Sequence, residues 1–328
     1  MSDDNSSKAD DVSPVAKPAD ADNDSATVAG EASKDQTEVG VGKVVEPAAE
    51  KAAEAKSKYI VEFKNVTKTY GVGGPNAFTA IKDITFKVED LPDKGEFISV
   101  LGPSGCGKST ILRLIAGLEP QHPATFGDVL VQDKPVTTTG ADRGMVFQDY
   151  TSFDHRTVLQ NITFGLECQN VHPKERMERG LEWIAKVGLD VDADRDKYPH
   201  ELSGGMRQRV AIARTLILHP RIILMDEPFG ALDPQTRADM QDLLVSLWRE
   251  VEATVFFVTH SIEEAVYLGD RVYILSSSPG RLVKEMEVEP PDRPAREMQR
   301  EPAFQETVYY IRDEITRLEH GASGDQPF

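Results

Sequence analysis

The sequence of 328 residues lacks any apolar run approaching the roughly 20 residues that a membrane-spanning helix needs. Its first residues show no basic region followed by an apolar one, the pattern of a secretory signal. It has only two cysteines, Cys106 and Cys168, too few for a disulfide framework, and we expect both to be reduced thiols. These absences predict a cytoplasmic chain, or one held by a partner at the cytoplasmic face of a membrane.

The sequence also lacks an excess of basic residues. Its 37 Lys and Arg residues stand against 55 Asp and Glu residues, which gives a formal net charge of −18. Proteins that bind nucleic acid usually present a basic surface to the phosphates. The charge balance therefore argues against a nucleic-acid partner.

Residues 1–57 contain no aromatic residue and carry 13 acidic residues against six lysines. Such a segment buries too little apolar surface to offset the entropy lost on ordering. We expect a disordered acidic extension, which is either a solvated segment or a spacer or interaction tail.

From residue 58 to about residue 285 the pattern is that of an α/β domain. The expected strands are Tyr59–Phe63, Ile84–Val88, Phe97–Leu101, Asp128–Val131, Gly144–Phe147, Ile222–Met225, Thr254–Thr259 and Arg271–Leu275. The last three are continuous apolar runs, typical of a largely parallel sheet covered on both faces. Residues 151–218 are predicted to form an inserted helical subdomain. Residues 286–328 are predicted to form a tail whose helix docks through an apolar stripe of Phe304, Val308, Ile311, Ile315 and Leu318.

The first candidate site lies between the predicted strand 97–101 and a helical pattern. It consists of Gly102, Pro103, Ser104, Gly105, Cys106, Gly107, Lys108 and Ser109, followed by Thr110. The spacing G-x-x-x-x-G-K-S after a strand and before a helix is typical of a loop that cradles phosphates with backbone N–H groups. Lys108 would reach the β- and γ-phosphates, and the Ser109 hydroxyl would ligate Mg²⁺. This loop predicts a nucleoside triphosphate site.

Two adjacent acids end the predicted strand 222–225. In α/β sheets, ligand chemistry gathers at the carboxyl ends of strands. Next to a phosphate loop, Asp226 is suited to hold Mg²⁺ through water, and Glu227 is suited to polarise an attacking water molecule.

A second glycine-rich segment, Leu202 to Arg209, precedes a long helical pattern. Ser203 is placed as the N-cap, and Gly204 and Gly205 leave backbone N–H groups open at the start of the helix. This arrangement is typical of a second anion site, although simple capping of the helix accounts for it equally well.

Taken in order, these motifs resemble those of the ATP-binding subunits of ABC transporters over residues 59–275. The resemblance rests on the phosphate loop, Gln148 after Met145-Val146-Phe147, Leu202–Met206, Asp226-Glu227, Ala231-Leu232-Asp233 and Thr259-His260. It implies a P-loop NTPase core with a helical subdomain, ATP and Mg²⁺ as ligands, and ATP hydrolysis coupled to transport.

The resemblance also implies roles for single residues. Tyr70 would stack on adenine, Gln148 would contact Mg²⁺ and sense the membrane partner, and His260 would contact the γ-phosphate. Asp233 would couple two subunits. Ser203 and Gly205 of one subunit would close on ATP held by Lys108 of the other, so that ATP bridges a homodimer or heterodimer.

A finer resemblance is to importers of nitrate, sulfonate, taurine or bicarbonate. It rests on residues 142–148, Phe164-Gly165-Leu166, residues 226–233 and the segment 278–283. It implies transmembrane permease subunits and an extracytoplasmic solute-binding protein as partners. The chain departs from that pattern at Asp154-His155, where Pro-Trp is usual, and in its acidic N-terminus and the insert 89–93. An ABC ATPase of a lipid-trafficking or export system, or one outside transport, stays an alternative.

Overall fold

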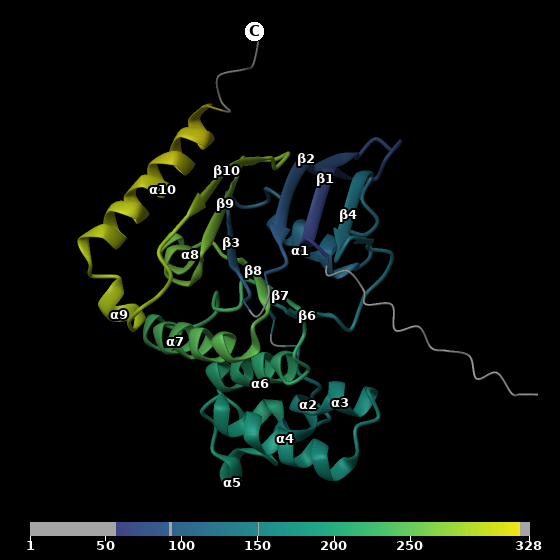
Figure 1. Cartoon of the computed structure of the whole chain (residues 1–328), viewed down its shortest axis with the longest axis vertical. Coiled ribbons are helices and arrows are strands. Elements are labelled where there is room, and N and C mark those ends of the chain that lie inside the picture. Colours follow the sequence, from purple (N-terminus) through teal and green to yellow (C-terminus); the bar gives the residue numbers. More distant parts are fainter. Residues whose placement is uncertain (1–56, 92–93, 150, 322–328) are drawn as a thin grey trace, which may run out of the picture. The chain divides into compact units, whose positions relative to one another are not determined.

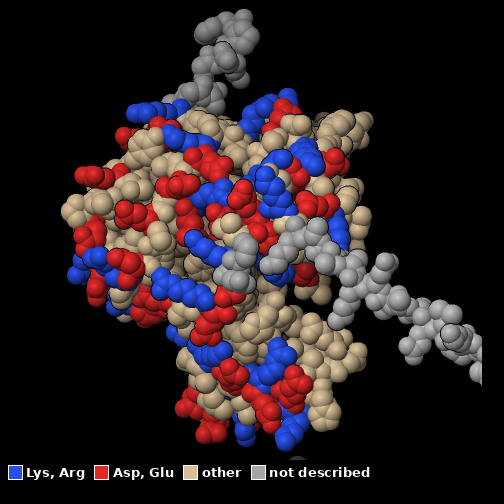
Figure 2. Space-filling view, viewed as in Figure 1, with Lys and Arg blue, Asp and Glu red and all other residues tan. Residues whose placement is uncertain are grey.

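The computed structural model describes residues 57–91, 94–149 and 151–321, all within one compact unit that spans Glu54–Phe328. Apart from Ser57, the disordered extension predicted for residues 1–57 lies outside the described residues. No helix in the described ranges is both long and apolar enough to cross a membrane. On the face drawn in Figure 2, acidic and basic side chains are interspersed.

The central sheet has six strands in the order β10-β9-β3-β8-β7-β6. Their bounds are β10 Leu282–Glu287, β9 Arg271–Leu275, β3 Phe97–Leu101, β8 Thr254–Val258, β7 Ile222–Asp226 and β6 Arg143–Val146. All neighbours are parallel except β10, which runs antiparallel to β9. The segments that follow β3, β7 and β8 therefore meet at one edge of the sheet, where α/β proteins place their ligand sites.

A second, four-stranded sheet has the order β2-β1-β4-β5 and is antiparallel throughout. Its strands are β1 Tyr59–Tyr70, β2 Phe78–Glu89, β4 Phe126–Val131 and β5 Lys134–Pro135. The sequence analysis predicted strands at Tyr59–Phe63, Ile84–Val88 and Asp128–Val131 but did not predict that they form an antiparallel sheet of their own. Residues 59–89 form a long hairpin around the turn 71–77, and a hairpin makes its strands antiparallel.

Helix α1 (Lys108–Ala116) packs between the two sheets and begins at the phosphate loop. Its apolar residues Ile111 and Leu112 belong to a buried cluster that joins Phe63 of β1 to Val100 of β3 and Phe256 of β8. The loop before α1 is therefore anchored from both sheets at once.

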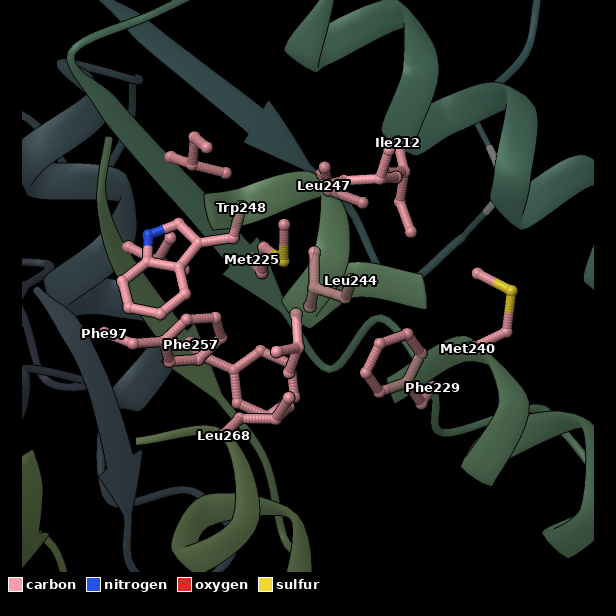
Figure 3. Packing of buried hydrophobic residues seen from close by; sticks show 14 of the residues in the cluster. Phe97, Ile212, Met225, Phe229, Met240, Leu244, Leu247, Trp248, Phe257 and Leu268 are labelled. Atoms are coloured by element: carbon pink, nitrogen blue, oxygen red, sulfur yellow. The ribbon is translucent and has the colours of Figure 1, made fainter. Parts of the chain in front are cut away.

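The opposite face of the central sheet is covered by α7 (Pro234–Val251) and α8 (Ile262–Leu268). Figure 3 shows Trp248 and Leu244 of α7 lying over Phe97 of β3 and Phe257 of β8. The rings of Phe97 and Trp248 meet edge to face with centroids 5.4 Å apart, a favoured aromatic geometry.

Among the described residues between β6 and β7, every regular element is a helix, in keeping with the inserted helical subdomain that the sequence predicted. The helices are α2 Val158–Ile162, α3 Phe164–Cys168, α4 Pro173–Lys186, α5 Val191–Asp194 and α6 Gly204–Leu216, with a 3-10 turn at Pro199–Glu201. In Figure 1 the first four gather beyond α6, away from the antiparallel sheet. Helix α6 reaches back to the central sheet, where it lies against β6.

The tail contains α9 (Ala295–Met298) and α10 (Pro302–Gly321), and α10 packs on α8. Phe304, Val308 and Ile311 are buried in this contact, and Ile315 and Leu318 pack at its margin. The predicted apolar stripe of the helix therefore faces the core. Figure 1 shows α10 running along the α8 side of the molecule.

Candidate active site

The phosphate loop connects β3 to α1 in a conformation that requires glycine. Gly105 and Gly107 adopt φ angles of +75° and +97°, in the left-handed region that side chains disfavour. A Cβ atom at Gly107 would also lie 2.4 Å from Ile81 Cγ2 of the neighbouring sheet. Glycine at this position therefore lets the loop pack closely against β2, and the N-terminus of α1 adds its partial positive charge to the loop.

Lys108 is nearly fully buried, and its ammonium is held by the loop itself. Its Nζ donates hydrogen bonds to the carbonyls of Gly102 at 2.8 Å and Pro103 at 3.1 Å. An anion entering the loop would offer this cation a stronger, charge-assisted partner. Cys106 points into the core instead, where burial raises the pKa of its thiol.

Ser109 and Asp226 meet although they lie far apart in the chain. The Ser109 hydroxyl donates a 2.7 Å hydrogen bond to Asp226 Oδ1, and Arg113 lies 3.6 Å from Oδ2. A hydroxyl and a carboxylate oxygen are the hard donors that Mg²⁺ prefers. Within the described ranges no group of three or more His, Cys, Asp or Glu residues forms a metal cluster, so a magnesium ion here would complete its shell with water and phosphate oxygens.

Glu227 follows Asp226 with a φ of +48°, an uncommon conformation for a residue with a long side chain. Its N–H donates to Val258 O at 2.9 Å, which ties it to the adjacent strand β8. Its carboxylate Oε1 lies 2.5 Å from His260 Nε2. The strained backbone therefore directs the carboxylate toward the residue that follows β8, as strain at functional sites often does.

Lys108, Ser109, Glu227 and His260 line one open cavity of about 320 Å³, and Asp226, which bonds Ser109, does not. The cavity is bounded by Tyr70, Phe78, Ala80, Ser104, Gly105, Gly107, Lys108, Ser109, Thr110, Glu227 and His260. The Tyr70 hydroxyl lies 3.3 Å from Thr110 Oγ1, which fixes the aromatic ring next to the first turn of α1. Gly102, Pro103 and Cys106 support the loop from behind and do not line the cavity.

Gln148 borders a different cavity, of about 500 Å³. That cavity is lined by Gln148, Asp149, Asp154, Pro199, His200, Arg207 and Ala231. The Gln148 amide nevertheless lies near the turn after Glu227, because a Cβ atom at Gly230 would lie 4.0 Å from Gln148 Nε2 and 3.5 Å from Glu227 O. Gln148 thus lies near the turn 227–230 but does not line the 320 Å³ cavity.

Ser203, Gly205 and Asp233 also lie outside the 320 Å³ cavity. Ser203 caps α6 and accepts from Met206 N at 3.3 Å. Asp233 caps α7 by accepting from Gln235 N and Thr236 N, and hydrogen bonds from Thr236 lower the pKa of its carboxyl. Among the described residues, none from the second glycine-rich segment lines the cavity that Lys108 lines.

The sequence analysis missed two lining residues, Phe78 and Ala80. Phe78 pairs directly with Tyr70 across the β1–β2 hairpin and is half exposed. In the sequence, Phe78 is an aromatic residue shortly after the turn cluster 71–75. Only the register of the β1–β2 hairpin shows that Phe78 and Tyr70 line the same cavity.

Comparison with known proteins agrees with the nucleotide-binding site that these residues form. The family model described as ABC transporter matches residues 81–230. An uncharacterized ABC transporter ATP-binding protein of Methanocaldococcus jannaschii is 49% identical over 234 residues, which cover 71% of this chain and 84% of that protein. The chain belongs to the ABC transporter family of ATP-binding proteins.

Two further relatives of this ABC ATPase have names that state a substrate. The nitrate import ATP-binding protein NrtD of Synechocystis is 43% identical and covers 78% of this chain and 93% of its own. The taurine import ATP-binding protein TauB of Rhizobium johnstonii is 45% identical and covers 70% of this chain and 86% of its own.

A solved structure supports the fold and the activity. The dimeric ATP-binding cassette MJ0796 bound to ADP and Pi is 34% identical, with a TM-score of 0.60 over 70% of this chain and 99% of that one. This ABC ATPase therefore has the predicted P-loop core with an inserted helical subdomain, and it is an ATP-hydrolysing enzyme.

Proposed function

We propose that this ABC ATPase powers the import of a small anion, such as nitrate, taurine or another sulfonate, or bicarbonate. Two of its relatives are named as nitrate and taurine import proteins and resemble it over more than two thirds of the chain. The chain would act as one of two ATP-binding subunits, bound to transmembrane permease subunits at the cytoplasmic face of the membrane. A solute-binding protein outside the membrane would deliver the anion.

The observation that supports the catalytic part best is the convergence of three segments at one sheet edge. In the proposed complex, Tyr70 stacks on adenine, and the backbone N–H groups of residues 104–110 surround the phosphates. Lys108 exchanges its two carbonyl partners for phosphate oxygens. Ser109, Asp226 and Gln148 would hold Mg²⁺, which neutralises charge that develops on the phosphates.

Glu227 is proposed to orient and polarise the attacking water. Its carboxylate lies 2.5 Å from His260 Nε2, and both residues line the cavity that would hold the phosphates. His260 would donate to the γ-phosphate, and its contact with Glu227 keeps the two side chains in one orientation. Pre-positioned groups of this kind supply most of the rate enhancement in phosphoryl transfer.

The second subunit is proposed to complete the site. Ser203 and Gly205 begin α6 with free N–H groups and a helix dipole, but they lie outside the cavity of their own chain. Related by a two-fold axis, the same helix of a second copy would cover the open side of the triphosphate. Asp233 would then couple the two subunits.

The 500 Å³ cavity beside Gln148 is proposed as the surface that contacts the permease. It lies between the helical subdomain and the core, since Pro199 and His200 come from the former and Ala231 from the turn after β7. Asp154 lines it, at the position where this chain departs from the anion-importer pattern. Gln148 lines this surface and lies near the turn after Glu227, so it can transmit a movement from one to the other.

Uptake measurements in the source cells test the proposal. A Glu227→Gln chain replacing the native one should abolish ATP-dependent uptake of one of the named anions, and the wild-type chain should co-purify with a permease. Unchanged uptake of all of these anions, or a co-purified membrane partner that exports lipid, would instead support the export alternative.

A further inference from the structure

The proposed role of His260 requires that its imidazole be held in one place, although half of its side chain is exposed. The structure shows what holds it. Thr259, the last residue before His260, is buried, and its hydroxyl accepts from Ser261 N at 3.0 Å. The hydroxyl thus bridges over His260 and fixes the backbone on both sides of it, as in the turns that Ser and Thr side chains form.

That hydroxyl is oriented by Glu264. Thr259 Oγ1 donates a 2.5 Å hydrogen bond to Glu264 Oε2, which leaves its lone pairs free to accept from Ser261 N. Glu264 N in turn donates to the Ser261 side chain at 3.1 Å. A single acidic residue on α8 therefore orders all three residues, 259 to 261, around His260.

Glu264 is itself an unusual group to find in a core. It is only 5% exposed, and burial raises the pKa of its carboxyl, while the hydrogen bond from Thr259 and the charge of Arg237 lower it. A buried carboxylate is costly unless it is paired and hydrogen-bonded. Its second oxygen, Oε1, lies 3.5 Å from Arg237 Nε.

Arg237 connects this group to the segment that contains Asp233. Its guanidinium donates to Leu232 O at 2.9 Å, directly before Asp233. The path from Leu232 to His260 consists of the hydrogen bonds at Leu232 O and at Thr259 Oγ1 and, between them, of an ion pair of Arg237 with Glu264 that is too loose for a hydrogen bond.

We infer that Glu264 is a positioning residue, which holds His260 against Glu227 through the Thr259 hydroxyl and links that position, through Arg237, to the segment before Asp233. The inference rests on the proposed function, because it assumes that the orientation of His260 matters for hydrolysis. Glu264 itself does not line the cavity.

The test is Glu264→Gln in the full chain, which keeps the shape of the side chain but replaces one accepting oxygen by an NH2 group, so that either the hydrogen bond from Thr259 or the pairing with Arg237 is lost. We expect kcat for ATP hydrolysis to fall about tenfold or more, since a small displacement of a reacting group has effects of that size. KM for ATP should stay within about twofold, because the phosphate loop is untouched. The matched control is Glu263→Gln, whose carboxylate bonds Ser261 and Arg312 but not Thr259, and which should keep the wild-type kcat.

A readout without ATP separates positioning from a general loss of stability. The imidazole proton signals of His260, identified by their loss in His260→Gln, should shift in Glu264→Gln and stay in place in Glu263→Gln. A folded Glu264→Gln chain with wild-type kcat and an unchanged His260 signal would overturn the inference. A Glu264→Gln, Arg237→Gln double variant should lose no more kcat than the larger single effect, because both changes break one path.

If Glu264→Gln does not fold, a pair of variants at Thr259 decides. Thr259→Ser keeps the hydroxyl and should keep kcat, whereas Thr259→Val keeps the shape and should lose it. Equal kcat for the two would overturn the inference. Failure of the proposed function looks different: His260→Gln would then hydrolyse ATP at the wild-type rate, while the signal shift would still report whether Glu264 positions His260.

Discussion

Glu227 Oε1 lies 2.5 Å from His260 Nε2, and the two residues follow neighbouring parallel strands, β7 and β8. The contact joins the candidate for polarising water to the candidate for holding the γ-phosphate. It forms because the N–H of Glu227 bonds Val258 O while its φ of +48° turns the side chain toward the end of β8.

The first prediction concerns that carboxylate. Glu227→Gln keeps the shape and a hydrogen-bonding amide but removes the charge that polarises water. ATP should still bind with its normal affinity, the ATP-bound dimer should accumulate, and turnover should fall by about 10²-fold or more. Nucleotide binding, size-exclusion chromatography with ATP and steady-state hydrolysis measure the three effects, and normal turnover would refute the role of Glu227.

The second prediction concerns Lys108. Lys108→Ala removes the cation that faces the phosphates, and a charge-assisted hydrogen bond of this kind contributes about 1.5–3 kcal/mol. ATP should therefore bind at least tenfold more weakly, a loss that titration calorimetry can measure. Lys82→Ala serves as a control, since Lys82 is exposed and does not line the cavity. Unchanged affinity and hydrolysis in Lys108→Ala would exclude the phosphate role.

Much of this site was predictable from the sequence, because the phosphate loop is a local motif. Lys108, Ser109, Asp226 and Glu227 follow strands that are short apolar runs, and the observed β3 and β9 have the predicted bounds. The contact of Glu227 with His260 and the role of Phe78 depend on strand order and hairpin register, which no local pattern states.

The elements that the sequence analysis missed are those with weak apolar patterns. Strand β10 alternates half-buried and exposed residues at the antiparallel edge of the sheet, and β5 has only two residues. The Glu264 path was missed for a different reason. A glutamate in a polar helix start is usually solvated, and its burial follows only from α7 and α8 packing together.

The third prediction concerns stability of the tail. The Tyr267 hydroxyl on α8 donates to Asp242 Oδ1 of α7 at 2.7 Å, and the same oxygen accepts from Ala295 N at the start of α9. Tyr267→Phe should lower the free energy of unfolding by about 1–3 kcal/mol, since it leaves a largely buried acceptor with one partner fewer.

The control for this change is Tyr310→Phe. Tyr310 is 45% exposed on α10, and its hydroxyl contacts only Lys284 among the described residues. Its removal should change stability by less than about 0.5 kcal/mol. Equal denaturation midpoints for the two variants would show that the hydrogen bond from Tyr267 to Asp242 does not stabilise the packing of the tail.

The fourth prediction concerns residues 1–57, which lie almost wholly outside the described part of the chain. Their lack of aromatic residues and their excess of acids predict that they do not pack on the core. Deleting them should leave hydrolysis and the melting temperature almost unchanged. A large decrease in either would show that the segment folds against the ATPase.

The last prediction is that Ser203 acts across a dimer. Lys108, Ser109 and Glu227 line one side of the cavity, and no residue of the second glycine-rich segment lines it in the described chain. The N-terminus of α6 offers a hydroxyl, open N–H groups and a dipole, which an exposed γ-phosphate would need. A two-fold axis would bring two such helices to two such cavities at once.

The test mixes a Lys108→Ala chain with a Ser203→Arg chain. If Ser203 acts in trans, each mixed dimer has one site with both defects and one site with none. If it acts in cis, every site carries one defect. We therefore expect the mixture to hydrolyse ATP faster than either variant alone. A mixture of Lys108→Ala with Glu227→Gln is the matched control, because both residues line one cavity and no mixed dimer can hold an intact site. If the mixture with Ser203→Arg hydrolyses ATP no faster than this control, Ser203 acts on the ATP site of its own chain and not across the dimer.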